Sequence, residues 1–343
     1  MHFFSKTNSM KEQIFKLNTT FVSAVSVVGK TESDGPLGDL FDFRENDDLF
    51  GCDTWEKAES ELQRRAFGLA LKKSGLRADE IGAVFAGDLQ NQCVGSGYGL
   101  LEFDIPYFGI YGACSTSVEG ILLASLMTSN GVCKHAAAVT SSHFCASERQ
   151  YRTPLEYGGQ RTPTAQRTVT GSGAFILGEG GSVRISEGMA GIVVDKGITD
   201  TSNMGAAMAP AALSTLVRYF KQSKCTPEDF DLILTGDLGH EGSEILRDLA
   251  EVEGIDIRAR HNDCGLMIYD RERQDVHAGG SGCGCAAVVL ACDIIPRLER
   301  GELSRVLFMA TGAMMSPSSI QQGLSIPGVA HLITIEGKNL WKC

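Results

Sequence analysis

Apolar residues gather along the chain in short runs separated by longer segments with a helical pattern. Four of these runs have the length and residue types of buried or half-buried strands: residues 21–28, 81–86, 135–140 and 170–177. Residues 54–75 carry a helical pattern, with Thr54 as the N-cap candidate and Gly75 near its end. This alternation of strands and helices predicts an α/β fold with mainly parallel sheet.

A polar stretch follows the third of these strands. Residues 144–168 are predominantly polar, and we expect a loop there. The stretch carries four arginines: Arg149, Arg152, Arg161 and Arg167.

The second half of the chain repeats this order. Its expected elements are a helix at 213–220, a strand at 231–235, a glycine-rich turn at 279–285 leading into a helix, and strands at 305–311 and 329–337. In both halves Gly-Asp-Leu closes a strand, at Asp88 and at Asp237. We therefore expect two duplicated α/β halves, residues 10–195 and 196–343, whose two sheets pack around shared helices.

Cys114 lies at the turn between an apolar run, residues 105–110, and a helical pattern that begins at once. Ser115 and Thr116 are both N-cap candidates for this helix, and Glu119 stands where a capping-box partner would fall if Thr116 is the cap. A thiol near a helix N-terminus has a lowered pKa and can act as a nucleophile, because free N–H groups and the helix dipole favour negative charge. The alternative is a small buried residue in a Gly/Ala-rich turn, and the turn alone favours neither.

Composition narrows the class of protein. The 343 residues are 43% hydrophobic and 21% charged, and the net charge of -11 argues against a nucleic-acid partner. The 11 cysteines show no recurring CxxC pair at zinc spacing, and no motif predicts a metal or a cofactor. We find no secretory signal and no apolar run long enough to span a bilayer, so we expect reduced thiols and a cytoplasmic location without a transmembrane segment.

With two repeated halves and a cysteine at a helix start in the first, the chain resembles the thiolase superfamily, whose fold is a layered αβαβα arrangement. Eight stretches are also similar to the stage V sporulation protein AD family of spore-forming bacteria: 35–38 (Gly-Pro-Leu-Gly), 86–89 (Ala-Gly-Asp-Leu), 112–117 (Gly-Ala-Cys-Ser-Thr-Ser), 140–143 (Thr-Ser-Ser-His), 157–160 (Tyr-Gly-Gly-Gln), 261–269 (His-Asn-Asp-Cys-Gly-Leu-Met-Ile-Tyr), 278–283 (Ala-Gly-Gly-Ser-Gly-Cys) and 316–317 (Ser-Pro). The resemblance covers nearly the whole chain.

This resemblance implies a non-catalytic protein that binds dipicolinic acid (pyridine-2,6-dicarboxylic acid), with or without calcium. It implies a role in uptake of that compound into the developing spore and in its release during germination. The implied partners are other stage V sporulation A proteins, with the chain associated peripherally with the forespore or spore inner membrane. Thiolase-like halves further imply a homodimer.

The alternative function is an acyl-thioester condensing or transfer enzyme that uses Cys114. Thiolase-like enzymes place a His after a second-half strand, or a His or an Asn in the turn before the second-half helix, as the partners of the thiol. Here Gly236 and the turn 279–282 stand at those places, so carbon–carbon bond formation should be lost. His240 and His277 lie nearby in the sequence, and we expect solvated loop positions for both. A scaffold with a vestigial pocket is a third possibility.

Dipicolinate is a flat dianion, so its site needs a slot for the ring, donors for the carboxylates and positive charge. The ligand-binding candidates are the helix start, the end of the neighbouring strand, the segment after it and one residue of the second half: Cys114, Ser115, Ser141, Ser142, His143, Glu148, Arg149, Arg152 and Asn262. Arg149 is the first choice for a bidentate carboxylate contact, with Glu148 as a partner that would orient it. For Asn262 the alternative is a structural turn held by local backbone bonds.

Overall fold

The computed structural model describes residues 13–151 and 161–341. Its strands are β1 (Ile14–Val28), β2 (Phe43–Arg44), β3 (Ala83–Gly87), β4 (Tyr107–Gly109), β5 (His135–Ser142), β6 (Arg167–Thr168), β7 (Gly171–Gly178), β8 (Arg184–Met189), β9 (Leu232–Thr235), β10 (His261–Asp263), β11 (Gly280–Ser281), β12 (Arg305–Ala313) and β13 (Gly328–Glu336). Its α-helices are α1 (Lys30–Ser33), α2 (Trp55–Ser74), α3 (Val94–Gly99), α4 (Thr116–Ser129), α5 (Phe144–Tyr151), α6 (Met204–Ser223), α7 (Gly239–Val252), α8 (Cys264–Met267), α9 (Cys283–Val289), α10 (Ile295–Arg300) and α11 (Pro317–Gln321). A π-helical segment, Leu290–Ile294, joins α9 to α10.

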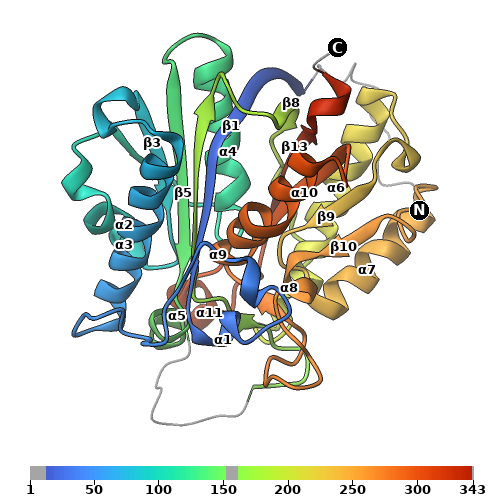
Figure 1. Ribbon diagram of the computed structural model, residues 1–343. Helices are drawn as coiled ribbons and strands as arrows, with labels where there is room; N and C mark the ends of the chain where they lie inside the picture. The colour runs from blue at the N-terminus through green and yellow to red at the C-terminus, as the bar shows by residue number, and fades with distance from the viewer. Residues whose placement is uncertain (1–12, 152–160, 342–343) are drawn as a thin grey trace.

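These elements form layers (Figure 1). Helices α2 and α3 cover one outer face of the molecule, and α6 and α7 cover the opposite one. Helices α4 and α9 lie between, where α4 contacts strands from both parts of the sheet. Across the two described ranges, no helix combines the length and the apolarity that crossing a bilayer requires.

One continuous sheet of eleven strands runs through the molecule in the order β10-β9-β12-β13-β8-β1-β7-β5-β3-β4, with β2 paired to β1. This differs from the expected two sheets, because the 15-residue β1 passes from one part to the other. Its residues 20–28 pair with β7 and its residues 14–20 with β8, both antiparallel.

The pairing pattern is the same when it is followed inward from either edge of the sheet. Strand β3 is parallel to β5, which is antiparallel to β7, and β9 is parallel to β12, which is antiparallel to β13. The division into halves at residues 195 and 196 stays a prediction.

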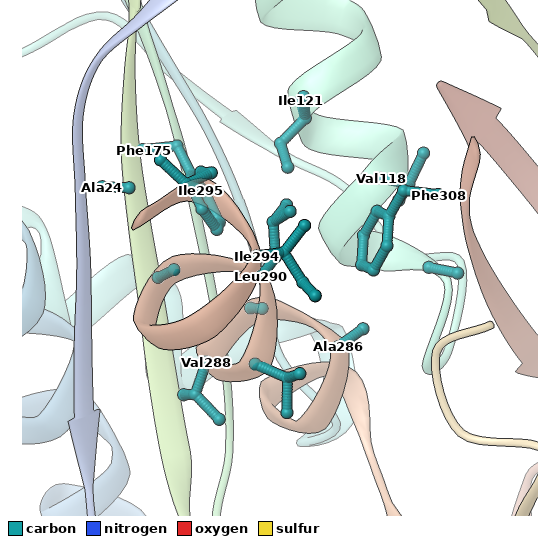
Figure 2. Packing of buried hydrophobic residues seen from close by; sticks show 14 of the residues in the cluster. Ala24, Val118, Ile121, Phe175, Ala286, Val288, Leu290, Ile294, Ile295 and Phe308 are labelled. Carbon is teal, nitrogen blue, oxygen red and sulfur yellow. The ribbon is translucent and has the colours of Figure 1, made fainter. Parts of the chain in front are cut away.

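The largest apolar cluster fills the layer between the two parts of the sheet. Figure 2 shows side chains of this cluster: Val118 and Ile121 of α4, Leu290 and Ile294, which continue from α9, and Phe308 of β12. All five side chains are fully buried. A helix covered on every side needs apolar residues around its whole circumference, as α4 has. This packing holds α4 against α9 and so fixes the turns that precede both helices.

The structure confirms the predicted helix at 54–75 and its ends. Thr54 Oγ1 accepts a hydrogen bond from the Lys57 N–H at 3.3 Å. Gly75 ends α2 with a left-handed φ of 72°, which a residue without a side chain adopts at no steric cost.

The predicted loop at residues 144–168 was wrong at its beginning, where α5 lies. The Phe144 N–H donates to Thr170 Oγ1 at 3.0 Å, and Ala146 and Ser147 are buried. The helix expected at 213–220 is the later part of α6, a helix of 20 residues. In both cases tertiary contacts extend helical structure beyond what the periodicity predicted.

Candidate functional site

A cavity of about 220 Å³ lies beside the Cys114 turn. Its wall combines residues of the turn itself, helix α5, the segment before β7 and the turn before α9. The residues that line the cavity include Tyr111, Cys114, Ser147, Glu148, Tyr151, Arg161, Gln166 and Ser281. The hydroxyl oxygens of Tyr111 and Tyr151 lie 3.2 Å apart, so the polar ends of two tyrosines meet on this wall.

The backbone of the Cys114 turn is strained and satisfies its own polar groups. Ala113 has a φ of 51°, in the left-handed region that residues with a side chain rarely adopt. The Ser115 N–H donates to Gly112 O at 3.1 Å and the Thr116 N–H to Ala113 O at 3.2 Å. These two N–H groups are therefore already used and do not point at a ligand.

Of the two N-cap candidates at this helix start, Ser115 holds the N-cap position, and its side chain makes no capping bond. Thr116 is the first helical residue, so the capping box that depended on Thr116 as the cap does not form. The Thr116 hydroxyl instead donates to Ala113 O at 2.6 Å and accepts from the Gly112 N–H at 3.0 Å. The side chain thus closes the turn that carries Cys114.

The expected lowering of the Cys114 pKa was also wrong. Burial raises the pKa of this thiol well above its usual value, and the negative charge of the nearby Asp237 raises it further. Its sulfur lies 3.9 Å from Ser281 Oγ. At neutral pH the side chain is a protonated thiol, which is a poor nucleophile.

The two places where thiolase-like enzymes carry a thiol partner are tightly packed here. A Cβ atom at Gly236 would lie 3.1 Å from Ala310 Cα and 3.2 Å from Ala286 Cβ. A Cβ atom at Gly282, whose φ is 96°, would lie 2.6 Å from Ser142 Oγ. Neither Gly236 nor Gly282 has room for a side chain without a shift of its neighbours.

Asp237 directly follows Gly236, and its carboxylate reaches the turn before α9. Its carboxylate accepts hydrogen bonds from the Ser281 hydroxyl at 3.1 Å, the Gly282 N–H at 3.0 Å and the Thr311 hydroxyl at 2.8 Å. Complete burial nevertheless raises its pKa to about 6.

The histidines that kept the enzyme alternative open lie outside the cavity wall. His240 is exposed, and His277 is half-buried with its Nε2 at 3.1 Å from Asp275 Oδ1. Neither belongs to the residues that line the cavity.

Ser141 and Ser142, predicted as ligand contacts, are fully buried and bonded to protein atoms. The Ser141 hydroxyl donates to Glu59 Oε1 at 2.9 Å. The Ser142 hydroxyl donates to Val169 O at 2.7 Å and accepts from the Gly284 N–H at 3.1 Å. Ser142 thus joins the end of β5 to the start of α9.

Most of the other predicted contacts also have protein partners. His143 Nε2 lies 2.7 Å from Asp48 O, and burial lowers the pKa of this imidazole. Asn262 Oδ1 accepts from the Asp263 N–H at 2.9 Å, which is the local backbone bond of the alternative interpretation. As ligand contacts, both stay predictions.

Arg149 makes its contacts with the first turn of helix α2. It pairs with Glu56 at 3.1 Å, and its guanidinium lies over the ring of Trp55, with 4.7 Å between the guanidinium carbon and the ring centroid. Of the nine predicted residues, Cys114 and Glu148 line the cavity, and Arg152 lies outside the described residues.

Three cavity residues that the sequence did not single out carry buried polar atoms without a partner: Ser147 Oγ, Arg161 Nη1 and Gln166 Oε1. Arg161 was one of four arginines in a polar stretch, and nothing in the spacing separated it from the other three. Ser147 looked like an ordinary loop residue because helix α5 was not predicted. Gln166 carried no signal.

Among the described residues, no group of three or more His, Cys, Asp and Glu side chains is placed to hold a metal ion.

Comparison with known proteins gives one family and one fold. A family model described as stage V sporulation protein AD matches residues 9–336. The stage V sporulation protein AD of Bacillus subtilis (strain 168) is 46% identical over 315 residues, which are 92% of this chain and 93% of that protein.

Similar solved structures are crystal structures of variants of Xanthomonas campestris OleA. Two of them have TM-scores of 0.59 and 0.60 at 13% identity and cover 95% of this chain and 100% of theirs. A third, with cerulenin, has a TM-score of 0.58 at 14% identity and covers 93% of this chain and 97% of its own. At this level of identity the likeness shows the thiolase-like fold alone.

Proposed function

The chain belongs to the stage V sporulation protein AD family, a family of sporulation proteins, and on this premise we propose that it binds dipicolinate in the cavity beside Cys114 without catalysing a reaction. In this role it supports uptake of dipicolinate into the developing spore and its release in germination. The proposed partners are other stage V sporulation A proteins at the spore membrane.

The cavity beside Cys114 is the observation that carries this proposal. Its volume of about 220 Å³ suits a small planar molecule better than a long acyl chain. Tyr111 and Tyr151 bring aromatic side chains to the wall, which suit contact with a pyridine ring. Arg161 adds a positive charge to the same wall.

The chemistry of Cys114 supports binding over acyl transfer. Acyl transfer needs a thiolate at working pH and a group that takes up the thiol proton. Here burial and Asp237 favour the protonated thiol. Ser281, its neighbour at 3.9 Å, is a hydroxyl that already donates to Asp237.

Calorimetric titration of the full chain with dipicolinate tests the proposal. We expect saturable binding of one ligand per chain. In a separate binding assay with labelled dipicolinate, unlabelled dipicolinate should displace the label. Absence of heat and of competition at millimolar ligand would refute it. The same titration with and without calcium shows whether the metal enters with the ligand.

Incubation with acyl thioesters tests the enzymatic alternative on the same sample. We expect no mass increase at Cys114 in intact-protein and peptide mass spectra. A stoichiometric acyl adduct on Cys114 would favour the transfer enzyme instead.

A homodimer is the second part of the proposal, and the edge strand β4 supports it. The outer side of β4 has no strand partner among the described residues. Tyr107 and Phe108 of this strand are exposed, as are Val94, Tyr98 and Leu101 from the preceding segment. An unpaired edge flanked by exposed apolar side chains is suited to pairing with a second copy.

A further inference from the structure

Three residues that line the cavity each carry a buried polar atom without a hydrogen-bond partner among the described residues: Ser147 Oγ, Arg161 Nη1 and Gln166 Oε1. Folded proteins rarely leave such atoms unsatisfied, because each one loses its hydration without compensation. Three of them on one cavity wall indicate that a ligand or ordered water completes their bonding.

Arg161 is held in a fixed orientation. Its Nη2 donates to Asp275 O at 2.6 Å and to Asp275 Oδ2 at 2.8 Å. Its side chain is only 10% exposed, whereas that of Asp275 is 81% exposed. One side of the guanidinium is therefore tied to a solvated carboxylate through Nη2, while Nη1 is buried and has no hydrogen-bond partner.

The orientation of Gln166 is fixed in the same way. Its Nε2 donates to Asp237 O at 2.7 Å and to Gly280 O at 2.8 Å, so its oxygen is the unpaired atom. An unpaired acceptor repels a carboxylate and accepts a bond from water or from a ligand donor. The anionic part of a ligand therefore has its donors at Ser147 and Arg161.

Arg161 brings a positive charge to the cavity wall, and this charge favours an anionic ligand. Among the cavity residues that the structure describes, Arg161 is the cation and Glu148 is the carboxylate. Without Arg161 no described residue of the cavity wall would offer a positive charge to a dianion. From these contacts we propose that Arg161 Nη1 and Ser147 Oγ bind one carboxylate of the ligand and select for planar aromatic carboxylates over neutral analogues. This inference rests on the proposed function, because it assigns the contacts of dipicolinate in that cavity.

Calorimetric titration of wild type and variants with two ligands tests it. The ligands are dipicolinate and pyridine-2,6-dicarboxamide, a neutral analogue of the same shape. For Arg161→Gln we expect dipicolinate affinity to fall by about tenfold to a hundredfold, since a charge-assisted bond is lost. The dicarboxamide should bind wild type more weakly than dipicolinate and should bind the variant about as well as wild type.

Three further variants separate the contact from effects on folding. Arg161→Lys keeps the charge without the planar fork and should lose about threefold to tenfold. Ser147→Ala removes a single hydroxyl and should lose about the same. Arg64→Gln is the matched control: Arg64 is paired with Glu61 at 2.6 Å and is not part of the cavity wall, so affinity should not change.

The outcomes distinguish this inference from the proposed function. If wild type does not bind dipicolinate, both fail. If wild type binds and Arg161→Gln and Arg161→Lys bind within twofold of it, the inference fails and the proposed function stands. An equal loss for dipicolinate and the dicarboxamide would also overturn it, because the effect would not depend on ligand charge.

Discussion

Cys114 Sγ lies 3.9 Å from Ser281 Oγ, and the Ser281 hydroxyl donates to Asp237 Oδ2 at 3.1 Å. The cysteine that the turn sequence suggested as a nucleophile is thus placed beside a buried acid. Burial and this neighbouring charge act in the same direction on the thiol, and both oppose ionisation.

Alkylation of Cys114 is therefore expected to be slow. At pH 7.5 we expect Cys114 to react with iodoacetamide on the order of tenfold more slowly than a free peptide thiol, or slower still. The reason is that very little of the Cys114 side chain is present as thiolate. Peptide mass spectrometry over time measures the rate at this cysteine. Asp237→Asn removes the neighbouring charge and should raise the rate modestly, since burial remains. A wild-type rate at or above that of the free thiol would contradict this account.

Glu59 makes the stability of the protein depend on pH. Complete burial raises its pKa from 4.5 to about 8, and the nearby charge of Asp88 adds to the shift. The folded state therefore binds the Glu59 proton more tightly than the unfolded state does. This contribution stabilises the protein at low pH and is lost as the pH rises from about 4.5 to about 8.

Glu59→Gln should flatten this dependence. The variant cannot ionise, so near pH 9 it should be more stable relative to wild type than at pH 5, by on the order of 2 kcal/mol. Urea unfolding at both pH values measures the difference. Glu253→Gln, at an exposed position, is the control and should leave the pH dependence unchanged. Parallel pH profiles for wild type and Glu59→Gln would argue against the buried proton.

Gly282 is expected to tolerate no side chain. Its φ of 96° disfavours any residue with a Cβ atom, and that atom would lie 2.6 Å from Ser142 Oγ. Gly282→Ala should cost about 1–3 kcal/mol of unfolding free energy. Gly97→Ala is the matched control in helix α3: its Cβ would meet no atom within 4 Å. That variant should be neutral or gain up to about 1 kcal/mol. Chemical denaturation compares the two, and equal effects would contradict the packing argument.

The β4 edge should control the oligomeric state. Phe108 is 51% exposed and its ring stacks on Phe85 with 5.0 Å between centroids. If β4 pairs with a second copy, Phe108→Lys places one positive charge from each copy at the contact, and the repulsion between them should shift the protein to a monomer. Light scattering after size exclusion measures the mass. Val252→Lys, at an exposed apolar residue on α7, should leave it unchanged. A monomeric wild type, or a dimer that survives Phe108→Lys, would count against this contact.

The sequence by itself determined the class of fold and the family. Strands such as β5 and β12 are short apolar runs, and Thr54 and Gly75 mark the ends of α2, because local preferences and side-chain periodicity act over a few residues. It also placed Cys114 at the start of a buried helix. Motif similarity then supplied the family, which the comparisons confirm.

Only the tertiary structure decided which polar side chains face the cavity. Ser141, Ser142 and Arg149 have side chains suited to a ligand, yet Glu59, Val169 and Glu56 take up their polar atoms. Arg161, Ser147 and Gln166 keep unpaired atoms on the cavity wall. The physical reason is that a polar atom's availability depends on burial and on partners far away in the sequence, such as Asp275 for Arg161. For the same reason the pKa of Cys114 could not be read from its turn: burial raises it, and the charge of Asp237, distant in the sequence, raises it further.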